Sequence, residues 1–291
     1  ACLAGFTFAQ DAPLWMRHSI ISPDGTTIAF TYKGDIYTVP VAGGRAMQIT
    51  TNPAYDTAPV WSPDSKRIAF ASDRMGSLDV YIVAKDGGEP RRLTTHSGSE
   101  TPLAFTDAGH VLFSAGIMPS AEAVVFPSNG QFNQVYRVSV EGGRPTMISS
   151  MPMECISINK EGAMLYQDKK GYEDYWRKHH VSPIARDIWM YTPGKEPQYR
   201  QLTTFGGEDR EPVWAPDGKT FYYLSEENGS FNIYRRTPGD AKAVQLTHYT
   251  KNPVRYLSAA TDGRLCYGFD GEIYTLLPGG EAQNRAGKRP V

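Results

Sequence analysis

Residues 61–70 read WSPDSKRIAF, and this stretch decides the fold of the chain. Its proline sets the first corner of a tight turn, and its aspartate can bond the neighbouring backbone. An apolar run follows at once, so the stretch predicts a β-hairpin. Further copies are SPDGTTIAF at 22–30, FTDAGHVLF at 105–113, INKEGAMLY at 158–166, WAPDGKTFYY at 214–223 and ATDGRLCY at 260–267.

Each copy continues in the same way. A third run carries an aromatic residue, as in Ile36-Tyr37, and a glycine turn leads to a fourth run, as in Gln48-Ile49-Thr50. Six such units predict an all-β chain, folded as a six-bladed β-propeller with four antiparallel strands per blade. A solenoid is the other repeat architecture, but antiparallel strands favour blades. The blade boundaries are expected near residues 51, 96, 151, 205 and 250.

The sixth copy lacks the fourth run. Either the N-terminal run at 14–16, which would close the ring, or the tail after Gly280 can supply that strand. We therefore expect a propeller over residues 11–283. Residues 284–291 would be a closing segment or a linker toward further domains.

The first ten residues, ACLAGFTFAQ, are small and apolar and end in a small-x-small pattern. This is typical of a signal-peptide remnant, with a buried first strand as the alternative. We therefore expect an exported protein, periplasmic or secreted. Cys155 and Cys266 lie far apart in predicted strands, so we expect two buried thiols and no bridge.

The overall charge is nearly balanced, with Lys+Arg 30 against Asp+Glu 31 and a net charge of −1. Such a chain has no general attraction to nucleic acid. The apolar content of 40% is enough for a core. No run approaches the roughly 20 apolar residues of a membrane span, so no transmembrane segment is predicted.

Three segments carry a resemblance to a known family. They read GDIYTVP at 34–40, PVWSPD at 59–64 and WRKHH at 176–180, the last followed by RDIW at 186–189. Over about residues 13–283 the chain resembles the N-terminal, TolB-like propeller of bacterial tricorn-type serine peptidases. The resemblance implies peptide or protein substrate as a partner. It also implies PDZ-like and serine-protease domains later in the same polypeptide, and neither occurs within residues 1–291.

Two connections between the second and third strands are much longer than the others. They run from Phe113 to Gln134 and from Tyr166 to Asp187, 21 residues in each case. Because they occupy equivalent places in adjacent blades, we expect them side by side on one face, as a docking or peptide-contact surface. The alternative is that they plug the channel or pack on each other. The residues expected to contact a peptide or partner are Phe126, Tyr172, Trp176, Arg177, His179, His180 and Arg186.

Further polar residues precede the predicted inner strands and should ring one mouth of the channel. A mixed ring of acids and arginine could meet peptide termini, with solvated rim charge as the alternative. The residues expected at this mouth are Tyr55, Asp56, Glu100, Glu208 and Arg210, with Glu154 and Asp209 beside them.

The sequence contains no Gly-x-Ser-x-Gly elbow, phosphate loop or zinc-helix motif. His179 and His180 are adjacent, and on extended backbone such side chains point apart. We therefore predict no catalytic residue, no metal site and no cofactor, and a non-catalytic propeller module of a tricorn-like peptidase. One alternative is a stand-alone, TolB-like periplasmic interaction propeller. The other is a metal-dependent lyase at the propeller mouth, which would need several converging histidines.

Overall fold

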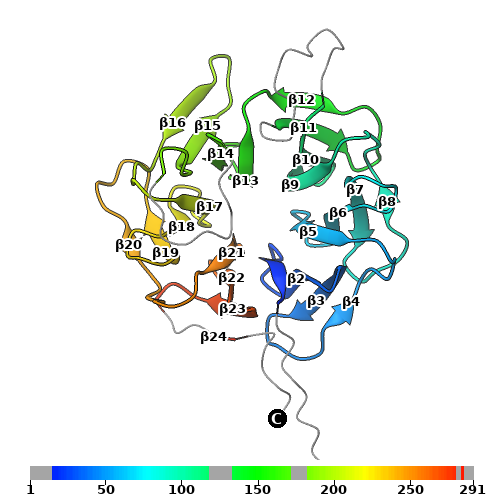
Figure 1. Cartoon of the computed structure of the whole chain (residues 1–291), viewed down its shortest axis with the longest axis horizontal. Coiled ribbons are helices and arrows are strands. Elements are labelled where there is room, and N and C mark those ends of the chain that lie inside the picture. Colours follow the sequence, from blue (N-terminus) through cyan, green and yellow to red (C-terminus); the bar gives the residue numbers. More distant parts are fainter. Residues whose placement is uncertain (1–14, 118–132, 172–181, 280–282, 285–291) are drawn as a thin grey trace, which may run out of the picture.

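The computed structural model describes residues 15–117, 133–171, 182–279 and 283–284. Six antiparallel sheets of four strands each are arranged as blades around a central axis (Figure 1). The predicted six-bladed propeller is therefore confirmed. Within the described ranges the chain forms strands and turns only, so they contain no helix able to span a membrane.

In every blade the strands follow one another from the axis to the outer edge (Figure 1). Blade one comprises β1 (Arg17–Ile21), β2 (Thr27–Tyr32), β3 (Asp35–Pro40) and β4 (Met47–Gln48). Blade two comprises β5 (Asp56–Trp61), β6 (Arg67–Ser72), β7 (Asp79–Ala84) and β8 (Arg91–Arg92). Blade three comprises β9 (Glu100–Asp107), β10 (His110–Ala115), β11 (Gln134–Ser139) and β12 (Thr146–Ser149). Blade four comprises β13 (Met153–Ile158), β14 (Met164–Asp168), β15 (Ile188–Thr192) and β16 (Gln198–Gln201). Blade five comprises β17 (Asp209–Trp214), β18 (Phe221–Ser225), β19 (Asn232–Arg236) and β20 (Val244–Gln245). Blade six comprises β21 (Arg255–Ala259), β22 (Leu265–Phe269), β23 (Glu272–Leu276) and β24 (Gln283–Asn284). Each predicted boundary falls between two blades.

The turn between the first two strands is held by its own aspartate. In blade one, Asp24 Oδ1 accepts from the Ser22 hydroxyl at 2.6 Å and from the Thr26 backbone N–H at 3.0 Å. Gly25 completes the turn with φ +71°, a conformation that glycine adopts at little cost. In blade two, Asp64 accepts from Ser62 in the same way at 2.5 Å. Both carboxylates therefore serve as hydrogen-bond acceptors within their own turns.

In most blades an aromatic residue of the third strand stacks on an aromatic residue of the second strand. Phe70 lies directly opposite Tyr81 in the ladder, with ring centroids 5.9 Å apart. The pair Phe113 and Tyr136 repeats this contact at 5.6 Å. Such cross-strand pairs stabilise a sheet beyond the area that they bury.

The ring closes where blade six packs against blade one. Cys266 is fully buried there, in one apolar cluster with Ile28 and Phe30. The backbone N–H of Thr261 donates to the Pro23 carbonyl at 2.9 Å. β24 pairs with β23, so the tail after Gly280 supplies the fourth strand of blade six.

Five of the six inner strands carry a bulge with a positive-φ residue that the sequence did not indicate; β9 also has register shifts, but without such a residue. At each bulge the ladder register shifts and a residue other than glycine has a positive φ. These residues are His18, Ala58, Cys155, Glu211 and Tyr256. A bulge changes the direction in which the side chain of the bulged residue points. In five blades the side chain at this position therefore departs from the regular alternation of the strand.

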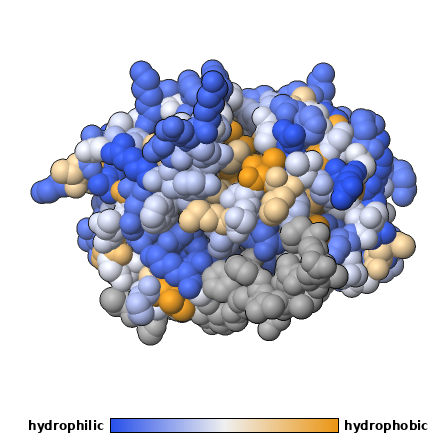
Figure 2. Space-filling model, turned by 90° about the horizontal axis from the view of Figure 1, so that it is seen from above, coloured by the Kyte–Doolittle hydropathy of each residue, from blue (hydrophilic) through white to orange (hydrophobic). Residues whose placement is uncertain are grey.

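One side of the propeller's outer wall is mainly polar. Seen from the side on which β12 and β16 lie, hydrophilic residues cover most of the surface, and apolar residues show in a small central area (Figure 2). β12 and β16 have four residues each, whereas β4, β8, β20 and β24 have two. The blades that carry the long insertions therefore also have the longest outer strands.

Candidate functional site

The two long insertions leave equivalent ends of adjacent blades. One connects β10 to β11 and the other connects β14 to β15, so both begin and end at the same rim of the ring. Six of the expected contact residues lie outside the described residues: Phe126, Tyr172, Trp176, Arg177, His179 and His180. The described part of this site is the base of the blade-four insertion, which includes Arg186.

The two ends of the blade-four insertion are tied to each other. Lys170 Nζ lies 2.5 Å from Asp187 Oδ2 and donates to the Ala185 carbonyl at 2.8 Å. The backbone N–H of Asp187 donates to Asp168 Oδ1 at 2.8 Å. These contacts fix where the insertion leaves the blade and where it returns.

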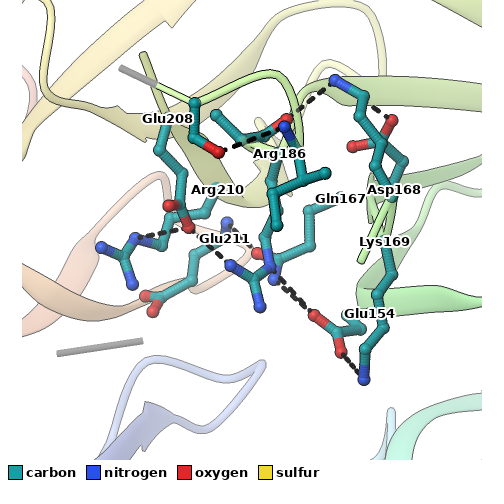
Figure 3. A network of polar contacts seen from close by, with 12 residues as sticks. Glu154, Gln167, Asp168, Lys169, Arg186, Glu208, Arg210 and Glu211 are labelled. Atoms are coloured by element: carbon teal, nitrogen blue, oxygen red, sulfur yellow. Dashed lines mark hydrogen bonds and ion pairs between the residues drawn. The ribbon is translucent and has the colours of Figure 1, made fainter. Parts of the chain in front are cut away.

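Arg186 joins this base to the neighbouring blade. Its Nε donates to Glu154 Oε2 at 3.2 Å, and its Nη1 donates to Glu208 Oε1 at 2.9 Å (Figure 3). Burial alone raises the pKa of Glu154, but the charges of Arg186 and Lys169 outweigh it and hold this pKa below its ordinary value. Glu154 is therefore a carboxylate at neutral pH. A guanidinium shared by two carboxylates in a buried place is held rigidly.

Glu208 also faces a second arginine. Arg210 Nε lies 3.7 Å from Glu208 Oε1, and the Arg210 guanidinium lies 3.7 Å from the centre of the Phe231 ring. The backbone N–H of Glu208 donates to Glu226 Oε1 at 3.0 Å. Arg210 is 1% exposed and Glu208 is fully buried, so this pair packs between blades.

Gln167 and Glu211 carry the network onward to blade six. Gln167 Nε2 donates to Glu154 Oε2 at 3.0 Å, and Gln167 Oε1 accepts from the Glu211 backbone N–H at 2.9 Å. Glu211 Oε2 accepts from the Leu257 backbone N–H at 2.8 Å. The base of the insertion is therefore linked through three consecutive blades (Figure 3).

The residues expected at the channel mouth are separated by the structure into two groups. Glu208 and Arg210 join Arg186 in the network, whereas Asp56 and Glu100 lie buried between other blades. Asp56 accepts from Arg74 Nη2 at 2.7 Å. Tyr55 is 43% exposed and is the member of the set that faces solvent. A contact between Tyr55 and a peptide stays a prediction.

One cysteine differs from its expectation. Cys266 is buried, as expected, but Cys155 is exposed, and neither forms a disulfide. The prediction of a buried Cys155 was wrong because the bulge in β13 gives this residue a φ of +51° and turns it out of the sheet packing. No glycine marks this bulge, so the sequence carried no signal for it.

His18 occupies the equivalent bulge in β1. Its Nδ1 lies 3.1 Å from the Thr57 hydroxyl, and its ring centroid lies 5.0 Å from that of Tyr256. Burial, with the charge of Arg17, lowers the pKa of His18 to about 4. Among the residues that the structure describes, no three metal-ligating side chains converge.

Sequence reasoning missed the partners that make the base of the insertion rigid. No pair between Lys170 and Asp187 is predicted from the sequence. Their opposite charges just after β14 and just before β15 are the signal that could have paired them. The repeated acids at strand starts were noticed, but not their burial.

Three comparisons place the chain among known proteins. The family model described as the tricorn protease N-terminal beta propeller domain matches residues 13–282. Tricorn protease homolog 1 of Streptomyces coelicolor is 26% identical over 268 residues, which are 91% of this chain and 24% of the relative.

The crystal structure of the tricorn protease superposes with a TM-score of 0.77 at 18% identity, over 96% of this chain and 27% of that one. TolB from Acinetobacter baumannii gives a TM-score of 0.66 at 15% identity, over 92% of this chain and 67% of that one. At such identities these structures show the shared propeller fold. Because the family model covers almost all of the sequence, the chain belongs to the family of tricorn protease N-terminal beta propeller domains.

Proposed function

We propose that this chain is the non-catalytic propeller of a tricorn-type serine peptidase, where it binds or gates peptide and docks the protease domains. The observation that carries this proposal is the family match over residues 13–282. The chain spans 24% of the length of the curated Streptomyces relative, which leaves room in such a protein for PDZ-like and serine-protease domains.

The rigid base of the blade-four insertion supports a docking role. Binding surfaces on loops are effective when a stiff scaffold positions them, because less entropy is lost on association. Here Lys170 and Arg186 fix both ends of the segment that contains Trp176 and Arg177. Tryptophan and arginine are the residues that most often dominate binding energy at protein interfaces.

We propose further that the parent protein is exported to the periplasm or secreted. This rests on the apolar, small-residue character of residues 1–10. The near-neutral net charge supports a peptide or protein partner rather than a nucleic acid.

The test separates the propeller from the rest of its parent polypeptide. We expect the purified chain to hydrolyse neither casein nor short peptides, and to associate with the separately expressed remainder in sedimentation experiments. A mock purification from cells lacking the chain controls for contaminating peptidase. Hydrolysis above that background would overturn the non-catalytic role. A parent gene that encodes no further domain would favour the stand-alone interaction propeller.

A further inference from the structure

Successive blades meet through a repeated backbone contact. The residue at or just before the start of an inner strand donates its N–H to a carbonyl within two residues of the start of the third strand of the blade before it. Glu100 donates to Leu78 at 2.6 Å, and Asp209 donates to Arg186 at 2.9 Å. Asp56 donates to Gly34 at 2.7 Å, and Val254 donates to Phe231 at 2.9 Å. This contact sets the donor residue beside the residue that follows the acceptor.

Three of the six junctions pair two acids in this way, and we call them the acidic junctions. They are Asp35 with Asp56 between blades one and two, Asp79 with Glu100 between blades two and three, and Asp187 with Asp209 between blades four and five. At the other three junctions the equivalent positions are Gln134 and Met153, Asn232 and Val254, and Glu272 and Met16. Those junctions hold at most one acid each.

At each acidic junction one of the two acids is paired with a cation, and at the third junction this cation, Lys170, also lies 3.6 Å from Asp168. Arg74 lies 2.7 Å from Asp56, Arg92 lies 2.9 Å from Asp79, and Lys170 lies 2.5 Å from Asp187. At two of these junctions the cation contacts the other acid of the pair, Asp79 or Asp187, and the remaining acid is deeply buried. These remaining acids are Glu100, which is 1% exposed, and Asp209, which is 2% exposed. The partly exposed Asp35 has water available instead.

The groups that face Glu100 and Asp209 do not supply a second positive charge in contact. Glu100 faces the Thr94 hydroxyl, the backbone of His96 and the Asp79 carboxylate, with Arg92 beyond Asp79. Asp209 faces the Ser225 and Thr203 hydroxyls and the charges of Asp187 and Glu227, and Lys170 pairs with Asp187. The ring of Tyr223 also lies close to Asp209.

Burial is the main reason why both acids hold their protons unusually well. It raises the pKa of Glu100 and of Asp209 to about 7 in each case, against the effect of the hydroxyls and with help from the neighbouring carboxylates. Two carboxylates at close range in a buried place cannot both ionise cheaply. Above this pH each junction contains two negative charges and one positive charge.

The two junctions concerned enclose blades three and four. These are the adjacent blades from which both long insertions arise (Figure 1). The junction between them pairs Gln134 with Met153 and so has no charge to release. We propose that the junctions at Glu100 and at Asp209 are proton-dependent contacts that each loosen when its own acid ionises, so that the two outer seams of blades three and four weaken over the same pH range.

Hydrogen exchange on the whole chain tests this inference. Protection factors, corrected for the intrinsic rate at each pH, are measured between about pH 5 and about pH 9. We expect peptides covering the starts of β9 and β17 to lose protection more than tenfold between about pH 5 and about pH 7, since one pKa unit corresponds to a tenfold change. Above about pH 7 each acid is ionised in the closed and in the opened junction, so protection should then stay constant. The peptide covering the start of β21, at the neutral Asn232–Val254 junction, should keep its protection and serves as an internal reference.

Two variants locate the effect. Glu100→Gln should abolish the loss of protection at β9 only, and Asp209→Asn should abolish it at β17 only. Glu89→Gln and Asp86→Asn remove exposed acids of the same types and should change nothing. Equal loss of protection at β9, β17 and β21 in the unmodified chain would overturn the inference, even if a variant failed to fold. Loss that persists in the folded Glu100→Gln and Asp209→Asn variants would overturn it too.

Discussion

Arg186 and Glu208 join two blades through a buried ion pair of 2.9 Å, although each side chain comes from a loop that ends at a strand. Arg186 precedes β15 in blade four, and Glu208 precedes β17 in blade five. The same guanidinium holds Glu154 at 3.2 Å. One side chain thus ties together the base of the blade-four insertion, its own blade and the next blade.

Replacing Arg186 by alanine should destabilise the propeller by about 3 kcal/mol or more, because it leaves two carboxylates in a buried place without their shared partner. Urea unfolding, followed by fluorescence, measures the change. Arg91→Ala is the matched control: it loses a pair with Glu141 that spans 2.7 Å on the surface, where solvent screens it, and a hydrogen bond to the Val140 carbonyl. It leaves no buried charge without a partner, so it should change the unfolding midpoint much less than Arg186→Ala. An equally small effect of Arg186→Ala would contradict the assigned role.

The stability of the chain should depend on the pH through Asp209. Its pKa is 3.8 when unfolded and about 7 when folded, so the folded state binds the extra proton. Its contribution is therefore fully present below about pH 4 and is lost as the pH rises to 7, at about 1.4 kcal/mol per unit and roughly 4 kcal/mol in all. The free energy of unfolding of the unmodified chain should fall across this window relative to that of Asp209→Asn. Parallel curves for the two proteins would refute this assignment.

Alanine at Trp176 should weaken the association with the protease domains or with peptide by roughly 2 kcal/mol, while the melting temperature stays the same. Trp176 lies outside the described residues, so its role comes from the sequence and from the anchored base alone. Tyr199→Ala removes an exposed aromatic residue from β16 in the same blade and should leave binding intact. If Trp176→Ala instead lowers the melting temperature, the insertion is structural packing.

Iodoacetamide should alkylate Cys155 in the folded chain and leave Cys266 unmodified. Cys155 is exposed, whereas Cys266 is sealed between blades six and one. Desolvation and the charges of Glu211 and Glu154 raise the pKa of the Cys155 thiol, so the labelling is run at alkaline pH to form the reactive thiolate. Peptide mapping by mass spectrometry, before and after denaturation, measures both sites in one sample. Modification of Cys266 without denaturant would show that the seam between these blades opens under native conditions.

The sequence predicted the elements that depend on local chemistry. The turns were readable because proline, aspartate and glycine act on their own neighbours, as Asp24 and Gly25 do. The rim position of both insertions followed from the order of the strands. Contacts between blades were not readable, since an aspartate at a strand start looks the same whether it faces water or another carboxylate. Only the packed ring shows that Asp56 and Glu100 are buried.

The bulges escaped prediction for a related reason. Their positive φ angles occur at histidine, alanine, cysteine, glutamate and tyrosine, and none of these residues announces such a conformation. The surrounding blades impose it on the inner strands. The exposed thiol of Cys155 is a direct result, and sequence periodicity alone put it inside.

Every blade of this ring is made from strands that are consecutive in the chain, and none of the described strands is exchanged across the seam between β1 and blade six. A gene that gains or loses one repeat therefore gains or loses one whole blade, without rethreading the rest. The same property gives the ring a mechanical weak line. Five of its seams are crossed by a covalent linker between blades, whereas in the part of the chain that the structure describes the sixth is held by packing and by hydrogen bonds such as that from Thr261 to Pro23. We therefore expect a force that pulls β1 away from blade six to open the ring at this seam first, while the six four-stranded sheets stay folded.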